Sequence, residues 1–466
     1  MKNLSSHRCR TWLAGFLACC AMLLSGCARE RPNVVLITVD TLRADRLGSY
    51  GADSQTPEMD RLASEGAVFL NAASPMPSTR PAHFSLLASR YPRDHGVTSN
   101  ALALAPEIQT LPEILLADGY RTGGFTGVAI LAKGSGAARG FETFDAPRSG
   151  ARPAGEVIPQ ALEWLESDEQ GPFFLWVHVY DPHMPYGPPD GVEVETPPEL
   201  ASPAFSRAAI WPHLERHDGN LSRHLYDYAL ALYRAEVEYT DRQLGRLFDA
   251  LRQRSDFERT AIVLTADHGE CFENGFYFEH GGCLGDGATR IPLILRYPPA
   301  VPAQERIERQ VELIDVAPTL LEIATLKPPA AWAGQSLLAA DSSPERERPA
   351  FIQHTVWSER ALRERRSRRE VFRSIDGMPV SPIDSINRLA LRTPSWKYHV
   401  SPMDEALYDL RTDPEERRNV ASTHRETVAE LRARLRRWLA DHPTRTTEPA
   451  ELDRELEKTL ESLGYL

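Results

Sequence analysis

The chain has 466 residues, of which 42% are hydrophobic and 25% are charged, and its formal net charge is −12. This length exceeds one small domain and is typical of a large α/β fold with a C-terminal addition. The acidic balance argues against nucleic acid or anionic lipid as the main partner, because both are negatively charged.

The N-terminus has the features of an export signal. Lys2, Arg8 and Arg10 precede an apolar run, "TWLAGFLACCAMLLSG", that is short for a membrane span and placed like the apolar region of a secretory signal. The run ends in "LSGC", which resembles a bacterial lipobox and predicts cleavage before Cys27 and lipid attachment to its thiol. An uncleaved anchor helix is the alternative. We therefore expect a lipid-anchored protein of the bacterial cell envelope, and Ala28 favours the outer membrane, facing the periplasm or the surface.

Two cysteines, Cys271 and Cys283, remain after such processing, and they flank the region that follows the motif "ADHGE". In an oxidising compartment they would form a disulfide; two free buried thiols are the alternative.

The hydrophobic pattern predicts strands that alternate with helices. Apolar runs rich in β-branched or aromatic residues predict strands at 33–39, 120–127, 172–180 and 260–266. Helical spacing is found at 56–66, 110–120 and 234–253. Such alternation implies a mainly parallel sheet covered on both faces. Beyond residue 340, "WKYHV" and "ALYDLRTDPEERRNV" predict a small antiparallel hairpin with a turn at Asp413-Pro414, followed by a helix at 423–440.

Carboxylates and imidazoles follow three of the predicted strands. They are Asp40 after the first, His178, Asp181 and His183 in "VHVYDPH", and Asp267, His268 and Glu270 in "ADHGE". The carboxyl ends of parallel strands meet at one edge of a sheet, where ligands bind. A single aspartate at such a position would be explained as a helix cap. Three strand ends of this kind are better explained by a site for Ca²⁺, Mg²⁺, Mn²⁺ or Zn²⁺.

The order and spacing of several stretches resemble the sulfatase family of the alkaline phosphatase superfamily. These stretches include "PNVVLITVDTLRADRLGSYG", "PAHFSLLASRYPRDHGV", "TADHGE", "TRIPLILRYP", "VELIDVAPTLLEIA" and "ALYDLRTDPEERRNVA". The resemblance implies an α/β, alkaline phosphatase-like three-layer sandwich with a mainly parallel sheet and a small C-terminal antiparallel subdomain. It divides the chain into a signal peptide (1–26), a catalytic domain (27–340) and a C-terminal subdomain (341–466).

Thr79 stands where sulfatases carry the cysteine or serine that is oxidised to formylglycine. Their motif Cys-x-Pro-Ser-Arg corresponds here to "TRPAH", from Thr79 to His83. Threonine cannot become formylglycine, because it lacks the CH₂ carbon that is converted to an aldehyde. The residue therefore resembles the nucleophile of threonine-dependent relatives and favours phosphate or phosphonate esters over sulfate esters.

The same resemblance implies that Asp40, Asp267 and His268 bind one divalent metal ion, with Thr79 Oγ completing the set. Sulfatases usually have a second aspartate directly after the first, where this chain has Thr41. The missing carboxylate disfavours Ca²⁺ and favours a smaller or more nitrogen-tolerant metal.

Four further residues are expected to act on the substrate. His183 corresponds to a histidine that meets an ester oxygen or protonates the leaving group, and His83 replaces the usual arginine beside the nucleophile. Asn100 and His280 correspond to substrate-binding positions, and His280 with Asp181 could hold a second metal. Ordinary structural histidines are the alternative for His183 and His280.

The leading interpretation is a hydrolase of phosphate, phosphonate or sulfate esters of a small molecule or glycan, acting through a covalent intermediate on Thr79. An envelope phosphoryl-alcohol transferase and a catalytically silent metal-binding relative are the alternatives.

Overall fold

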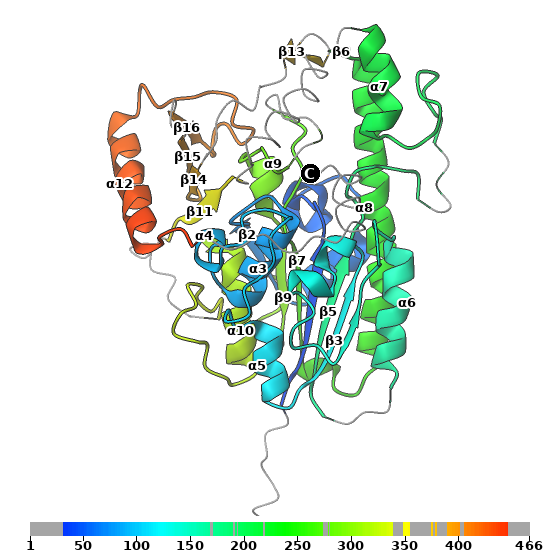
Figure 1. The fold of residues 1–466 in the computed structure, drawn as a ribbon, viewed down its shortest axis with the longest axis vertical. Coiled ribbons are helices and arrows are strands. Elements are labelled where there is room, and N and C mark those ends of the chain that lie inside the picture. The colour runs from blue at the N-terminus through cyan, green and yellow to red at the C-terminus, as the bar shows by residue number, and fades with distance from the viewer. Residues whose placement is uncertain are drawn as a thin grey trace, which may run out of the picture.

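The computed structural model describes residues 31–167, 171–189, 192, 194–217, 220–273, 278, 280–338, 348–354, 374–375, 378–379, 389–400 and 405–445. They form an α/β sandwich and a smaller antiparallel sheet that lies beside one end of it (Figure 1). The predicted signal peptide and Cys27 lie outside the described residues, so export and lipidation remain predictions.

The sandwich is built on a nine-stranded sheet of order β10-β2-β9-β7-β1-β5-β3-β4, with β8 paired to β2. The strands are β1 Asn33–Val39, β2 Ala67–Ala73, β3 Arg121–Thr126, β4 Thr143–Asp145, β5 Phe173–Val179, β7 Thr260–Ala266, β8 Arg290–Ile291, β9 Leu293–Arg296 and β10 Glu305–Glu312. Parallel pairing joins β7, β1, β5, β3 and β4, while β9 is antiparallel to β7 and β2. Strands β1, β5 and β7 are buried throughout, as expected for central strands covered on both faces. The predicted α/β class and mainly parallel sheet are confirmed.

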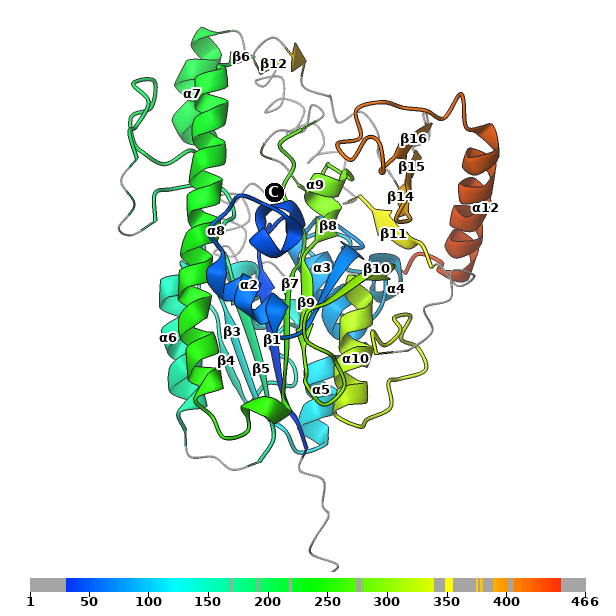
Figure 2. The same cartoon turned by 180° about the vertical axis from the view of Figure 1, so that it is seen from behind.

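Helices cover both faces of this sheet (Figures 1 and 2). One face carries α2 Pro57–Ser64, α6 Ala154–Leu165 and α8 Arg223–Arg252, and the other carries α3 Thr79–Ala88, α5 Leu111–Ala117 and α10 Val316–Ile323. Shorter or peripheral helices are α4 Pro92–His95, α7 Arg207–Arg216, α9 Asp286–Thr289, η1 Ala44–Arg46, η2 Gly48–Tyr50, η3 Ala129–Leu131, η4 Lys133–Ser135, η5 Phe257–Arg259 and η6 Leu313–Asp315. The helix predicted at 234–253 is the second part of the longer α8. Among the described residues, no helix combines the length and apolar composition needed to cross a membrane.

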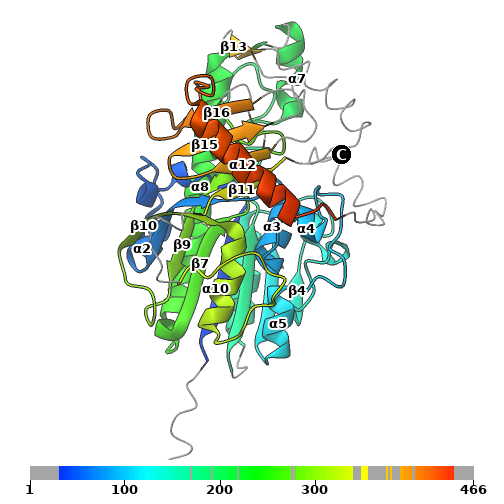
Figure 3. The same cartoon turned by 90° about the vertical axis from the view of Figure 1, so that its left-hand side faces the viewer.

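The smaller unit is a four-stranded antiparallel sheet of order β11-β14-β15-β16. Its strands are β11 Ala350–Gln353, β14 Leu389–Arg392, β15 Trp396–Val400 and β16 Glu405–Asp409. Helix α12, Arg425–Asp441, crosses one face of this sheet and packs Leu431, Leu435 and Trp438 against it (Figure 3). A separate small sheet joins β6 Asn220–Leu221, β12 Ser374–Ile375 and β13 Met378–Pro379.

The predicted C-terminal hairpin is β15 paired with β16, but its position needs a correction. The paired residues run from 396–400 to 405–409. Asp413 therefore follows the hairpin instead of turning it, and its carboxylate accepts the backbone N–H groups of Arg417 and Arg418.

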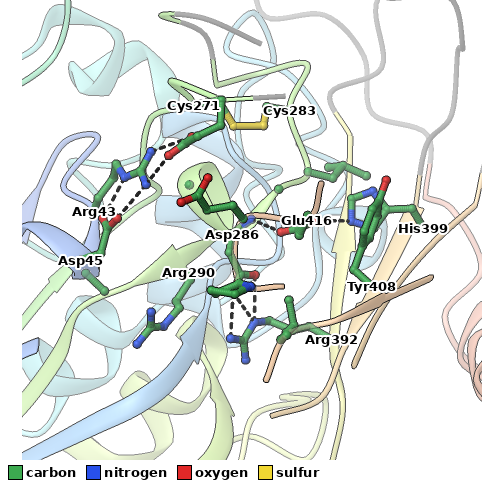
Figure 4. Close-up of a pocket in the computed structure, with 18 of the residues that line it drawn as sticks. Arg43, Asp45, Cys271, Cys283, Asp286, Arg290, Arg392, His399, Tyr408 and Glu416 are labelled. Carbon is green, nitrogen blue, oxygen red and sulfur yellow. Dashed lines mark hydrogen bonds and ion pairs between the residues drawn. A yellow bond between two sulfur atoms is a disulfide. The ribbon is translucent and has the colours of Figure 1, made fainter. Parts of the chain in front are cut away.

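Buried charges join the two units. The carboxylate of Asp286 on α9 accepts hydrogen bonds from Arg392 of β14, at 2.9 Å, and from Lys397 of β15, at 2.8 Å. Figure 4 shows Asp286, Arg392 and Glu416 at a cavity of about 790 Å³ between α9 and the small sheet. The lining of this cavity includes no member of the candidate metal group described next.

Candidate active site

Three potential metal ligands lie together at the carboxyl edge of the central strands. Asp40 follows β1 directly, and Asp267 and His268 follow the neighbouring strand β7. One ligand atom from each residue lies within 4.8 Å of the others, and all three side chains are fully buried. The structure thus brings together the residues that were expected to meet at this edge.

Several polar atoms of this group lie close to one another. Both carboxylate oxygens of Asp40, and Oδ2 of Asp267, are buried and have no hydrogen-bond partner in the part of the chain that the structure describes. Nδ1 of His268 lies 3.0 Å from the carbonyl oxygen of Gly269, which can only accept, so this nitrogen carries the proton. Nε2 of His268 then presents a lone pair, 3.4 Å from Asp267 Oδ2.

Burial has a direct electrostatic effect on these carboxylates. It raises the pKa of Asp40 to about 8, with the nearby Glu270 adding to the rise. Burial and the charge of Asp40 raise the pKa of Asp267 well above its usual range. Within the described residues no lysine or arginine forms an ion pair with either carboxylate. A divalent cation fits this donor set, because it would offset both charges and fill the unpaired acceptor sites.

Thr79 opens helix α3 beside this group. Its Oγ lies 3.4 Å from Nε2 of His268, and the residue is fully buried. Asn100 fixes the start of the helix, because its Oδ1 accepts hydrogen bonds from the backbone N–H of Arg80, at 2.8 Å, and from Ser78 Oγ, at 3.2 Å. The Nδ2 group of Asn100 is buried without a partner among the described residues. A donor that is available in this way suits an ester oxygen.

His83 lies beneath the metal group, one turn along α3 from Thr79. Its Nδ1 is 2.8 Å from the carbonyl oxygen of Thr79 and 3.6 Å from Asp267 Oδ2, and burial lowers its pKa well below the usual range. His178 on β5 takes the equivalent position under Asp40, with 3.5 Å between Nε2 and Oδ2. The sequence predicted that His178 lies near a strand end, but it did not predict a specific catalytic or metal-binding role for this residue.

A second pair of histidines lies on the other side of His268. The ring of His280 stacks on that of His268 with centroids 4.6 Å apart, and His183 meets His280 edge-on at 5.0 Å. Tyr180 is 2.7 Å from Nδ1 of His183, and burial lowers the pKa of this imidazole. His280 therefore contacts the candidate ligand His268 directly, and His183 contacts it through His280.

Asp181, which was expected to share a possible second metal with His280, contacts the start of helix α6. Its carboxylate accepts the backbone N–H of Ala154 at 2.7 Å, at the first residue of α6, and burial raises its pKa to about 6. His280 instead contacts Glu270, with 3.2 Å between Nδ1 and Oε1, and Glu270 also accepts from Tyr186. Within the described residues, Asp181 and His280 belong to no second group of three potential ligands.

A disulfide and a hydrogen bond restrain the loop that carries Asp267 and His268. Cys271 and Cys283 form a disulfide, which decides between the two alternatives left open by the sequence (Figure 4). Arg43 donates to the carbonyl oxygen of Glu270 at 3.0 Å. The fixed loop limits how far the candidate ligands can move.

Comparison with known proteins agrees with this geometry. Residues 32–326 match the family described as Sulfatase. A sulfatase of Formosa agariphila is 25% identical over 359 residues, covering 64% of this chain and 70% of the relative. Arylsulfatase K of Bos taurus is 24% identical over 467 residues, covering 87% of this chain and 81% of the relative.

The fold is also that of a solved hydrolase. The phosphonate monoester hydrolase of Agrobacterium radiobacter superposes with a TM-score of 0.68 at 22% identity, covering 88% of this chain and 96% of that one. This likeness concerns the fold. Together with the family match over more than half of the sequence, it shows that the chain belongs to the sulfatase family and is an ester hydrolase of the alkaline phosphatase superfamily.

Proposed function

We propose that this protein is a metal-dependent hydrolase of phosphate or phosphonate esters that works through a covalent intermediate on Thr79. The observation that carries the proposal is the position of Thr79 Oγ, 3.4 Å from Nε2 of His268, beside the buried carboxylates of Asp40 and Asp267, three of whose oxygens have no hydrogen-bond partner among the described residues. Sulfate esters are the second candidate, because the relatives named above include sulfatases.

The nucleophile itself favours phosphorus over sulfur. Attack by Thr79 Oγ on the ester forms a bond to phosphorus and releases the alcohol with a proton. A formylglycine hydrate could then expel the acid group by elimination, but a threonine ester has no second hydroxyl on its β-carbon. Water must therefore attack the phosphorus, returning Thr79 as an alcohol and releasing the phosphate or phosphonate. This second displacement is the route expected for an alcohol nucleophile.

Asp40, Asp267, His268 and Thr79 would hold the metal ion. When bound, the ion would lower the pKa of the Thr79 hydroxyl and offset charge on the ester. Thr41, in the place of a second aspartate, offers no carboxylate, so two carboxylates and one imidazole remain. Such a set fits Mn²⁺ or Zn²⁺ better than Ca²⁺, which prefers six to eight oxygens.

The remaining residues would orient the ester. Asn100 Nδ2 would donate to an ester oxygen next to the start of α3, where helical N–H groups also favour negative charge. His183 and His280, on the other side of His268, would contact a second oxygen or protonate the leaving alcohol. The alcohol part is proposed to be a small molecule or a glycan.

Removal of the metal provides the test. After treatment with a chelator, the activity on p-nitrophenyl phosphate, a phosphodiester or a phosphonate monoester should decrease by at least about 100-fold. Addition of Mn²⁺ or Zn²⁺ should restore this activity. p-Nitrophenyl sulfate, assayed in parallel, should be the poorer substrate. Full activity in metal-free protein would contradict the metal dependence, and faster turnover of the sulfate would reverse the proposed ester preference.

We also propose that the mature protein is an envelope lipoprotein that begins at Cys27. The sequence carries a lipobox-like "LSGC", and the disulfide between Cys271 and Cys283 suits an oxidising compartment. The intact mass of protein taken from the envelope should correspond to a lipid-modified chain starting at Cys27, with Cys271 and Cys283 linked. A chain that retains Met1 and has free thiols at both positions would contradict this location.

A further inference from the structure

Thr38 lies two residues before Asp40 on β1, and its hydroxyl is surrounded by three ring nitrogens. Nε1 of Trp176 donates to it at 3.0 Å, Nδ1 of His178 lies at 3.0 Å, and Nε2 of His83 lies at 3.3 Å. Thr38, His83 and His178 are fully buried. The two imidazoles meet edge-on with centroids 4.5 Å apart, and each also touches one of the metal-site carboxylates.

The protons in this cluster can be assigned by elimination. Nδ1 of His83 faces only acceptors, namely the carbonyl oxygen of Thr79 and Asp267 Oδ2, so it carries a proton. A neutral His83 then presents a lone pair at Nε2, and this lone pair takes the single proton of the Thr38 hydroxyl. The hydroxyl has two acceptor sites left, and Trp176 fills one of them. For all three contacts of the hydroxyl to be hydrogen bonds, the other site takes a proton from Nδ1 of His178, 3.0 Å away.

This assignment leaves Nε2 of His178 without a proton. That nitrogen lies 3.5 Å from Asp40 Oδ2, and neither atom has a hydrogen-bond partner among the residues that the structure describes. Two buried acceptors that face each other are unfavourable unless a proton or a cation lies between or beside them. A hydrogen bond from His178 would satisfy Asp40 without a metal, and the Thr38 hydroxyl prevents that arrangement.

We propose that Thr38 is a positioning residue of the metal centre, which fixes the tautomers of His83 and His178 so that Asp40 is completed by a cation and not by a hydrogen bond. The proposal rests on the proposed metal-dependent function. Thr38 is not a member of the candidate ligand group, and it would act through the two imidazoles that lie beside Asp40 and Asp267. Partners of this kind, one step removed from the ligands, typically change metal affinity or activity by about 10–100-fold.

Two substitutions of Thr38 distinguish the effect of its hydroxyl group on metal binding from the effect of its side-chain shape. Thr38→Val keeps the branched shape and removes the hydroxyl, while Thr38→Ser keeps the hydroxyl and removes the methyl group. The affinity for Mn²⁺, measured by titration calorimetry, should fall by about 10–100-fold in Thr38→Val and stay within about threefold of the parent in Thr38→Ser. In Thr38→Val, kcat at limiting Mn²⁺ should fall with the affinity, while KM for the ester should change little.

Thr265→Val is the matched control. Thr265 lies opposite Thr38 in the β1–β7 register and is equally buried, but its hydroxyl donates to the carbonyl oxygen of Pro292 at 2.8 Å. This variant should bind Mn²⁺ within about threefold of the parent, although it also loses a buried hydrogen bond. The thermal midpoints of the three variants report on folding separately from metal affinity.

The possible results distinguish failure of the inference about Thr38 from failure of the proposed function. Parent-like Mn²⁺ affinity in Thr38→Val would overturn the inference and leave the proposed function intact. Equal losses in the valine and serine variants would also overturn it, because the effect would then follow packing and not the hydroxyl. A parent protein that binds no divalent ion would overturn both the inference and the metal-dependent function.

Discussion

Replacement of Thr79 by alanine should reduce kcat on the best phosphate or phosphonate ester by about 10⁴-fold or more, because loss of a covalent nucleophile typically has an effect of this size. Asp40, Asp267 and His268 remain in the variant, so Mn²⁺ should still bind, with an affinity within about tenfold of the parent. Turnover and metal titration on the same preparation would check the two expectations together.

The neighbouring hydroxyl provides the control. Ser78 precedes Thr79, and its Oγ donates to Asn100 Oδ1 instead of facing His268. Ser78→Ala should therefore reduce kcat far less than Thr79→Ala does, and Thr79→Ser should keep turnover within about tenfold. A peptide that carries Thr79 and an added phosphoryl group should accumulate after acid quenching. Activity that survives Thr79→Ala but is lost in Ser78→Ala would move the nucleophile to Ser78.

The sequence predicted the positions of strands that are buried in the centre of the sheet. The apolar runs at 33–39 and 260–266 coincide with β1 and β7, because strands in the middle of a parallel sheet are buried on both faces and leave a continuous hydrophobic signal. Residues directly after such strands share one edge of the sheet. This rule places Asp40, Asp267 and His268 at one edge with several other polar residues, and the family resemblance selects these three, which the structure brings into one group.

The sequence did not predict contacts that depend on the direction in which a side chain points. Asp181 and His183 are two residues apart, yet one holds the start of α6 and the other meets His280. The contact of Thr38 with His178 depends on the register of β1 against β5, in which these two residues are opposite each other. Strands β1 and β5 are buried on both faces and show no apolar–polar alternation, so their sequences do not specify which of their residues are opposite each other.

A second large effect is expected at Lys397, which lies far from Thr79 in the sequence. Its Nζ is fully buried and contacts Asp286 at 2.8 Å, Thr289 Oγ at 2.9 Å and Glu416 at 3.3 Å. Although burial opposes the shift, the charges of Arg392 and Lys397 hold the pKa of Asp286 far below its usual range. Without Lys397, the buried Glu416 and the partly buried Asp286 would share one fewer cation.

Lys397→Met should therefore lower the free energy of unfolding by about 3–5 kcal/mol, the usual cost of removing one partner from a buried ion pair. Arg432→Met, on helix α12, is the matched control, because Arg432 pairs with Glu405 at the start of β16 in the same small sheet. Arg432 pairs with Glu405 at 2.6 Å, but both side chains are more than one-third exposed, so its loss should cost no more than about 1 kcal/mol. Denaturant unfolding of both variants gives the comparison, and equal losses would show that the buried cluster is no more important than a surface pair.

The position of the cluster links this stability to the active site. Asp286 and Thr289 are the two ends of α9, and the carbonyl oxygen of Ala288 between them accepts the backbone N–H of Gly269 at 2.8 Å. Gly269 directly follows the candidate ligand His268. Loosening of α9 in Lys397→Met should thus weaken Mn²⁺ binding as well as folding, whereas Arg432→Met should leave Mn²⁺ binding unchanged. A destabilised Lys397→Met protein that binds Mn²⁺ like the parent would show that the small sheet supports the fold alone, and that Asp267 and His268 are held by their own loop.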